Sequence, residues 1–337
     1  MIRAAVGPLA RALERGRLKT PVALLAARVW AARAVVSRPV ALPRGTAVIG
    51  VGGATLGGSH KTPVALALAA ALSNRGERVA VVAHGYASRL RGAREAAPGD
   101  TARGIGDDAA WLARELAPAG VPVFVGDRSR ALALAALRAP VIVVDGLLQA
   151  RPARLALSLL AIDAAAPWGA DACPPAGDLR APRDALLDAA DAVVAVAPEE
   201  PPGLAIPGRP YFCVRTELLA GVASNGEVVD LAAARRVRIG VVLSIARPDR
   251  FIRSLAARGI EPVITRLFAD HTVPRAAPSH RAMPAVDMWL TTPKCATKLG
   301  EHYEGAPVVV VRQRLLRPDG MVALCLGAAS LRGAPDR

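Results

Sequence analysis

The sequence predicts an α/β fold, with a parallel sheet covered by helices on both faces and a smaller α/β domain after it. Three observations support this class. The chain has 337 residues, and 53% of them are apolar, which is enough for one large or two medium domains and excludes a disordered chain. Short, fully apolar segments alternate with helical ones, as in sheets buried on both faces. A glycine-rich loop joins the first apolar segment to the next helix.

The apolar segments of the first half of the chain are rich in valine, isoleucine and alanine and predict strands. We expect these strands at 46–51, 78–83, 121–125, 140–145 and 157–163. Segments between them predict helices at 63–74, 107–116 and 129–137. Because crossovers between parallel strands are right-handed, such helices cover both faces of the sheet.

A change in composition divides the chain. Proline and glycine are dense at 198–210, which is typical of a linker, and we place the linker at 201–211. The division gives a first domain over 45–200 and a smaller α/β domain over 212–337. In the smaller domain we expect a helix at 248–258 and strands at 237–243, 262–266, 288–291 and 307–311.

Basic charge is concentrated at the N-terminus. The net charge is +15, and residues 1–44 hold nine basic residues against one acidic residue, more than half of the excess. Thr20 and Pro21 predict a helix N-cap and first helical position. The helix carries Trp30 but is interrupted by two arginines, so it is not a spanning segment. We interpret 1–44 as a basic amphipathic segment that associates with an anionic membrane surface. A surface helix docked on its own domain is the other interpretation.

Composition argues against further classes. The four cysteines lie far apart without a CxxC pair, which makes a disulfide scaffold or a zinc ribbon improbable and favours a reducing compartment. The charge of +15 is the only argument for nucleic-acid binding, since aromatic residues make up 3% of the chain and no known nucleic-acid motif is found. We therefore expect no nucleic-acid partner. The oligomeric state is left open.

The segment with the clearest chemistry is the loop at 55–62. It follows a strand and opens a helix, the context that a P-loop requires. Backbone N–H groups of such a loop hold phosphates, the lysine reaches the β/γ oxygens, and the threonine hydroxyl binds Mg²⁺. The expected nucleotide-binding residues are Thr55, Leu56, Gly57, Gly58, Ser59, His60, Lys61 and Thr62.

The loop departs from the pattern G-x-x-x-x-G-K-[ST] at two positions. Thr55 and His60 stand where the pattern has glycine. If His60 has to be left-handed, its Cβ costs about 1–2 kcal/mol. A glycine-rich strand-to-helix turn with a chance Lys-Thr pair is the alternative interpretation.

Asp145 ends a fully apolar strand. An acid in this position of a P-loop fold binds Mg²⁺ directly or through water, so Asp145 and Thr62 are the predicted metal residues. A loop cap is the alternative for Asp145, because aspartates are common at strand ends.

At this point a family resemblance becomes visible. VGGATLGGSHKTP (51–63) resembles the loop "VGNxTVGGTGKTP" of the tetraacyldisaccharide 4'-kinases, the kinases of lipid A. Further segments match in the order of that family and extend the resemblance over nearly the whole chain. They are HGYASR (84–89), Gly106-Asp107-Asp108, VIVVDGLLQ (141–149), PPAGDLRAP (174–182), ARPDRF (246–251), FADH (268–271) and TTPKCATK (291–298).

The resemblance implies a P-loop kinase domain at 45–200, with an active site completed by 212–337. It implies transfer of the ATP γ-phosphate to the 4'-hydroxyl of an acylated disaccharide 1-phosphate lipid. The protein would be peripheral, at the cytoplasmic face of the inner membrane. ATP and Mg²⁺ are the implied cofactors. Asp107 and His271 match the catalytic carboxylate and histidine, and the retained Gln149 is expected at the cofactor site. Without the resemblance, Asp107 reads as a helix N-cap and His271 as a surface histidine.

Several motif positions differ from the family pattern. These are His60, His84, Gly146, Leu147, Ala150, Ala181, Pro293 and Cys295. The leading hypothesis is an active kinase. The differences at His60, Gly146 and Ala181 motivate a second, a degenerate non-catalytic paralogue that keeps the fold and lipid binding. The alternatives from other classes are a nucleic-acid-binding protein, for which the charge of +15 is the only argument, and a different P-loop enzyme acting on a small metabolite.

Overall fold

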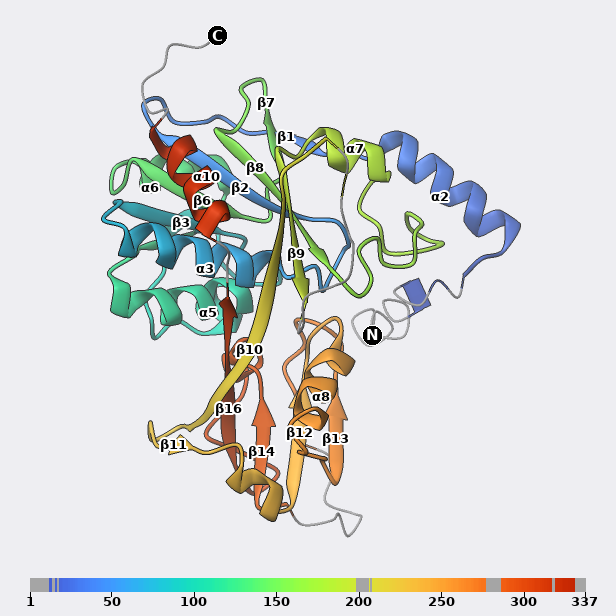
Figure 1. Cartoon of the computed structure of the whole chain (residues 1–337), viewed down its shortest axis with the longest axis vertical. Helices are drawn as coiled ribbons and strands as arrows, with labels where there is room; N and C mark the ends of the chain where they lie inside the picture. The colour runs from blue at the N-terminus through green and yellow to red at the C-terminus, as the bar shows by residue number, and fades with distance from the viewer. Residues whose placement is uncertain are drawn as a thin grey trace.

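The computed structural model describes residues 12–13, 16, 18–197, 206, 208–276, 286–316 and 319–330. The described chain forms two lobes that lie one above the other in Figure 1. A single sheet runs through both lobes in the order β13-β12-β14-β16-β10-β9-β8-β2-β6-β3-β5-β4. The mixed α/β class predicted from the sequence is confirmed.

The N-terminal lobe contains a parallel sheet with β2 at its centre. Its parallel strands are β2 (Ala47–Gly53), β3 (Val79–Ala83), β5 (Val123–Gly126), β6 (Val141–Asp145), β8 (Leu157–Asp163) and β9 (Ala192–Ala197). The short strand β4 (Ala93–Glu95) is antiparallel at the edge. Five of the strands match predicted ones, whereas β4 and β9 have no counterpart in the sequence prediction. All seven residues of β2 and of β8 are buried, so both faces of the sheet are covered.

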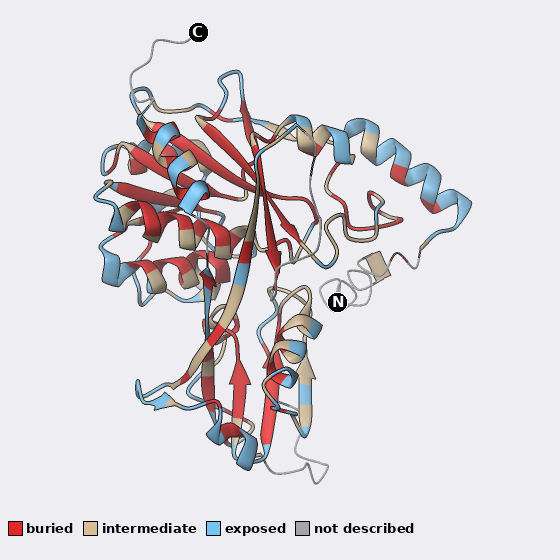
Figure 2. Ribbon diagram, viewed as in Figure 1, coloured by how far each residue is buried: buried red, intermediate tan, exposed pale blue. Residues whose placement is uncertain are grey.

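Helices cover the two faces as predicted. One face of the sheet packs on α3 (Lys61–Asn74) and α5 (Asp107–Leu116), and the opposite face packs on α6 (Arg128–Ala136). Successive strand residues alternate between the two cores, so Ile49 lies in the first and Val48 in the second. Figure 2 shows the buried strands between these helices.

The C-terminal lobe is smaller. It contains β12 (Ile239–Leu243), β13 (Ile264–Leu267), β14 (Met288–Thr291) and the helix α8 (Pro248–Ala256). Two long strands, β10 (Tyr211–Ala223) and β16 (Ala306–Leu316), pair antiparallel with each other and reach into both lobes. The start of β10 pairs with β9, and β16 pairs with β14, which makes the sheet continuous.

The chain then returns to the N-terminal lobe. The last described helix, α10 (Asp319–Ser330), packs against α3 and places Met321, Cys325 and Ala329 in the same core as Leu68. The segment 212–337 is therefore split between the lobes. Most of the expected linker at 201–211 lies outside the described residues, and its last residue, Tyr211, already begins β10.

The N-terminal helix has the predicted cap. Helix α2 (Pro21–Arg33) begins after Thr20, whose Oγ1 accepts the Ala23 N–H at 3.2 Å. Only Ala23 and Ala27 are buried, and the helix extends away from the lobes in Figure 1. Residues 1–11 of the basic segment lie outside the described part of the chain. Within the described part, no helix has the length and apolar character needed to cross a membrane.

The remaining elements are short and join the larger ones. They are α4 (Ala102–Ile105), α7 (Arg183–Asp188), α9 (Pro293–Ala296), β1 (Ser37–Pro39), β7 (Gln149–Arg151), β11 (Val228–Val229) and β15 (His302–Tyr303).

Candidate active site

The loop between β2 and α3 forms an anion cradle. Within the described part of the chain, the backbone N–H groups of residues 57–62 have no protein acceptor. They lie at the N-terminus of α3, where unpaired N–H groups and the helix dipole attract phosphate. The outer side of the loop is anchored, because the Arg180 guanidinium donates to the carbonyls of Thr55 at 2.7 Å and Leu56 at 3.0 Å.

Beside the cradle lie the residues predicted to hold Mg²⁺. The Thr62 hydroxyl donates to Asp145 Oδ2 at 2.8 Å, and Lys61 Nζ lies 3.5 Å from Asp145 Oδ1. Asp145 is fully buried. A hydroxyl and a carboxylate oxygen at the end of a P-loop are the hard ligands that Mg²⁺ prefers, and the neighbouring ammonium is in place for phosphate. These residues therefore fit a Mg²⁺–nucleotide site.

His60 is in the left-handed conformation, with φ at 60°. A residue with a Cβ in this left-handed region carries a backbone strain of about 1–2 kcal/mol. Its ring contacts Arg250 of α8, with Nε2 and Nη1 2.7 Å apart. Burial and the charges of Arg250 and Arg247 lower the pKa of His60 to about 3, so the ring is neutral and accepts this bond. A hydrogen bond from a charged donor contributes about 1.5–3 kcal/mol and offsets the strain.

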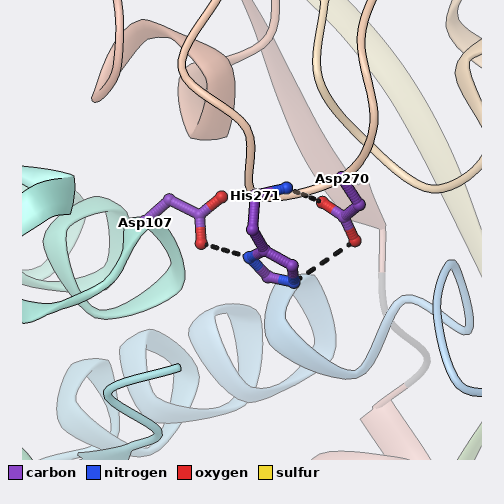
Figure 3. A group of neighbouring side chains, drawn as sticks. All are labelled: Asp107, Asp270 and His271. Carbon is purple, nitrogen blue, oxygen red and sulfur yellow. Dashed lines mark hydrogen bonds and ion pairs between the residues drawn. The ribbon is translucent and has the colours of Figure 1, made fainter. Parts of the chain in front are cut away.

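The second cluster brings together the two residues of the expected catalytic pair, which lie 164 positions apart in the chain (Figure 3). Asp107 is the first residue of α5, and His271 lies in the loop after β13. His271 Nδ1 is 2.7 Å from Asp107 Oδ1, and its Nε2 is 3.3 Å from Asp270 Oδ2. Asp270 also accepts the His271 backbone N–H at 2.9 Å. The Tyr86 ring packs on the imidazole at 4.7 Å between centroids.

Two lysines balance the carboxylates of this cluster. Lys298 Nζ is 2.6 Å from Asp107 Oδ2 and its side chain is 1% exposed. Lys294 Nζ lies 3.2 Å from Asp108 Oδ1 and 3.3 Å from Asp270 Oδ1. Burial raises the pKa of Asp107, but the His271 hydrogen bond and both lysines outweigh burial and hold that pKa well below its usual range. Burial lowers the pKa of Lys294, but Asp108, Asp270 and Asp107 together raise it well above its usual value.

Asp107, Asp270 and His271 offer ligand atoms within 4.8 Å of one another, so a metal ion is a second possibility for this cluster. The two ammonium groups already occupy the same carboxylates. Their charge opposes a divalent cation here, and the Thr62–Asp145 pair is the better Mg²⁺ site.

The sequence analysis did not identify Lys294 and Lys298 as site residues, although the composition of the chain contains a signal for them. All but four of the 43 basic residues are arginines, and three of the four lysines, Lys61, Lys294 and Lys298, lie in the two clusters. A lysine retained in so arginine-rich a chain marks a place where a compact ammonium is needed rather than a planar fork.

Other predicted residues serve the framework. Gln149 is buried, its Nε2 donates to Ser158 Oγ at 3.0 Å, and its Oε1 accepts the N–H groups of Ala150 and Leu155. The structure thus places the Gln149 amide in internal hydrogen bonds rather than toward the cradle. Thr55 Oγ1 donates to the Gly57 carbonyl at 2.7 Å within the loop.

Five of the positions that depart from the family pattern are packed or hydrogen-bonded within the fold, whereas His84 is exposed and Pro293 is half-buried. Leu147, Ala150 and Ala181 are buried in apolar cores. The carbonyl of Gly146, which has φ at 83°, accepts from Arg128 at 3.3 Å. Cys295 is buried, and its Sγ accepts the Ser244 N–H at 3.2 Å.

A phosphate cradle on one lobe and a carboxylate–histidine pair closed by the other lobe define a P-loop kinase. The family model of the tetraacyldisaccharide-1-P 4'-kinases matches residues 17–325, and the chain belongs to this family.

Individual relatives agree with this assignment. A tetraacyldisaccharide 4'-kinase of Methylobacterium sp. (strain 4-46) is 37% identical over 333 residues, which cover 94% of each chain. The enzyme of Anaeromyxobacter sp. (strain K) is 34% identical over 88% of this chain and 85% of its own. The fold is similar to that of LpxK from Aquifex aeolicus, crystallised in complex with ATP, with a TM-score of 0.65 at 22% identity. That match covers 97% of this chain and 99% of the other.

Replacing Asp107 by asparagine should destabilise the protein by about 3–5 kcal/mol at pH 7, because Lys298 is left buried beside a neutral group. Since the pKa of Asp107 is depressed in the folded state, its contribution is present above the unfolded pKa near 4 and is lost as the pH falls further. Urea unfolding of both proteins from pH 7 to pH 3 should show the difference shrinking below about pH 4. The control Asp319→Asn removes a carboxylate that is 97% exposed and should change little. A difference independent of pH would contradict the assignment.

Lys298→Arg should lower the kinase turnover at least tenfold although the charge is kept. A guanidinium is too large for a site where the lysine is 1% exposed, and overpacking costs about 1–3 kcal/mol. The matched control is Lys19→Arg at an exposed position. Steady-state assays of both variants and of the unmodified protein test this. Equal turnover of Lys298→Arg and the unmodified protein would show that a positive charge alone is sufficient at this position.

Proposed function

We propose that the chain transfers the γ-phosphate of ATP to the 4'-hydroxyl of a tetraacyldisaccharide 1-phosphate, a step of lipid A biosynthesis. Family membership supports this reaction, and one structural observation carries it. The cradle with Lys61 and Asp145 and the Asp107–His271 pair are assembled in one chain from two lobes. Phosphoryl transfer needs both parts, since charge on the phosphate has to be stabilised and the hydroxyl has to be positioned and deprotonated.

In this proposal His271 is the base and Asp107 orients it. Asp107 is held by Lys298 and has a depressed pKa, which makes it a poor proton acceptor. Its contact with Nδ1 leaves Nε2 for the substrate, and the 4'-hydroxyl takes the place of the Asp270 carboxylate at that atom. The hydroxyl proton passes to Nε2, the bond from the 4'-oxygen to the γ-phosphorus forms, and the bond to the β-phosphate oxygen breaks to release ADP.

Thr62 Oγ1 and Asp145 would hold Mg²⁺ in this proposal. When bound, the ion neutralises the β/γ-phosphate oxygens. Lys61 reaches the same oxygens, and the N–H groups of residues 57–62 orient the phosphate chain. The non-catalytic hypothesis finds no support in the described site, because the replaced positions leave these groups in place.

We further propose that the protein binds peripherally to the cytoplasmic face of the inner membrane through α2. Val22, Leu25, Val29 and Trp30 are between 46% and 78% exposed. Apolar side chains on a helix that follows a strongly basic segment suit the boundary of an anionic bilayer. A lipid substrate would then be presented at the surface where the enzyme lies.

Lys61→Ala should lower Mg²⁺-ATP-dependent phosphorylation of the disaccharide 1-phosphate at least a hundredfold, because it removes the cation nearest Asp145 and the phosphates. Radiolabelled transfer by the purified full-length protein measures this, with Arg236→Ala, at an exposed position outside the basic segment and the site, as the control. Absence of turnover in the unmodified protein, or equal turnover of Lys61→Ala, would refute the proposed reaction.

The double substitution Leu25→Ser and Trp30→Ser should weaken binding to phosphatidylglycerol vesicles several-fold without altering the fold. Each side chain contributes apolar area that leaves water on binding. Cosedimentation measures the effect, and Leu137→Ser is the matched control, since Leu137 is 79% exposed on α6's C-terminal side. An equal loss in the control, or none in the double variant, would contradict a docking role for α2.

A further inference from the structure

His60 is the position at which this chain differs most from a P-loop, and the structure shows what the side chain contacts. The residue precedes Lys61 and adopts the left-handed conformation that glycine tolerates best. Its ring reaches out of the N-terminal lobe to Arg250 on α8, with Nε2 and Nη1 2.7 Å apart. A glycine in this position would keep the turn but lose this contact.

Arg250 joins three acceptors that belong to the N-terminal lobe. Its guanidinium contacts the Gly58 carbonyl, the His60 ring and Asp163 Oδ2. Two of the three acceptors are in the phosphate loop, and Asp163 ends β8. The Arg250 side chain is 18% exposed and that of Asp163 is 7% exposed, so solvent screens these contacts only weakly.

Arg247 strengthens the same junction. It pairs with Asp163 Oδ2 at 3.2 Å and with Asp178 Oδ2 at 2.9 Å. The backbone carbonyl of Asp178 accepts the Leu56 N–H at 2.8 Å, which ties the start of the loop to this network. Gly58 packs so closely on Arg247 that an added Cβ would lie 2.9 Å from its Cγ. The N-terminal end of α8 therefore rests directly on the loop.

We propose that His60 and Arg250 form a latch that fixes the phosphate loop to the C-terminal lobe. Both are positioning residues for the nucleotide, and this role rests on the proposed kinase function. Arg250 holds the loop through a carbonyl and a side chain, while the N–H groups of residues 57–62 have no acceptor among the residues that the structure describes. The latch thus arranges the cradle before phosphate arrives. Because the C-terminal lobe also carries His271, the latch sets the position of the cradle relative to the base.

A double-mutant cycle on the full-length protein tests the latch. We would measure the Kd of Mg²⁺-ATP by calorimetry for His60→Gly, Arg250→Ala and the double variant. Each single substitution should weaken binding at least fivefold, and the double variant should bind about as weakly as the weaker single one. The control is Arg253→Ala on the exposed side of α8, which should show no coupling to His60→Gly. If the change in Kd of the double variant equalled the product of the two single changes to within twofold, the latch would be refuted.

Hydrogen exchange of the nucleotide-free protein gives a second measurement that does not depend on the kinase reaction. Exchange across Leu56–Leu66 should accelerate several-fold in each single variant and no further in the double variant. If the unmodified protein bound no Mg²⁺-ATP, the proposed kinase function would be refuted. The hydrogen-exchange rates of the single and double variants would still test the latch. Should Arg250→Ala not fold, Arg250→Lys replaces it, because lysine keeps the charge beside Asp163 but not the forked geometry. Independent effects on exchange would overturn the latch in either case.

Discussion

The site depends on the attraction between buried opposite charges across the boundary of the two lobes. At the phosphate end, Arg247 and Arg250 of the C-terminal lobe pair with Asp163 and Asp178 of the N-terminal lobe. At the acceptor end, Lys298 and Lys294 pair with the carboxylates at the start of α5. Neither lobe holds a complete site by itself, since the cradle and the histidine belong to different lobes. The ion pairs connect the two lobes at both ends of the candidate site.

Buried pairs of this kind contribute little net stability, because removing two charges from water costs about as much as their attraction returns. Their effect is on geometry. The Asp107 carboxylate is held by Lys298 on one oxygen and by His271 Nδ1 on the other, which leaves Nε2 as the imidazole nitrogen that Asp107 does not contact. The long strands β10 and β16 keep the lobes together in the sheet, and the charge clusters set their alignment at the site.

The differences from the family motifs divide into two kinds. Ala150 and Ala181 replace polar residues of the family motif and Leu147 replaces a glycine, and all three are buried in apolar cores. His60 adopts the left-handed conformation that glycine tolerates best, and its ring contacts Arg250 in the opposite lobe. A motif difference is therefore weak evidence of lost function when the structure around it supplies a compensating contact.

Features that depend on residues close together along the chain could be predicted from the sequence. The alternation of apolar and helical segments was sufficient to predict five strands of the N-terminal lobe. The residue spacing at 55–62 was sufficient to identify the loop before α3. The expected pairing of Asp107 with His271 came from resemblance, since no local pattern links residues 164 positions apart. The packing of α10 in the core of the N-terminal lobe and the internal hydrogen bonds of the Gln149 side chain are evident only in the folded protein. The same holds for the ion pairs of Lys298 with Asp107 and of Arg250 with Asp163. Contacts between distant segments follow from how the sheet and its two lobes pack, and the spacing of residues along the chain carries no record of that packing.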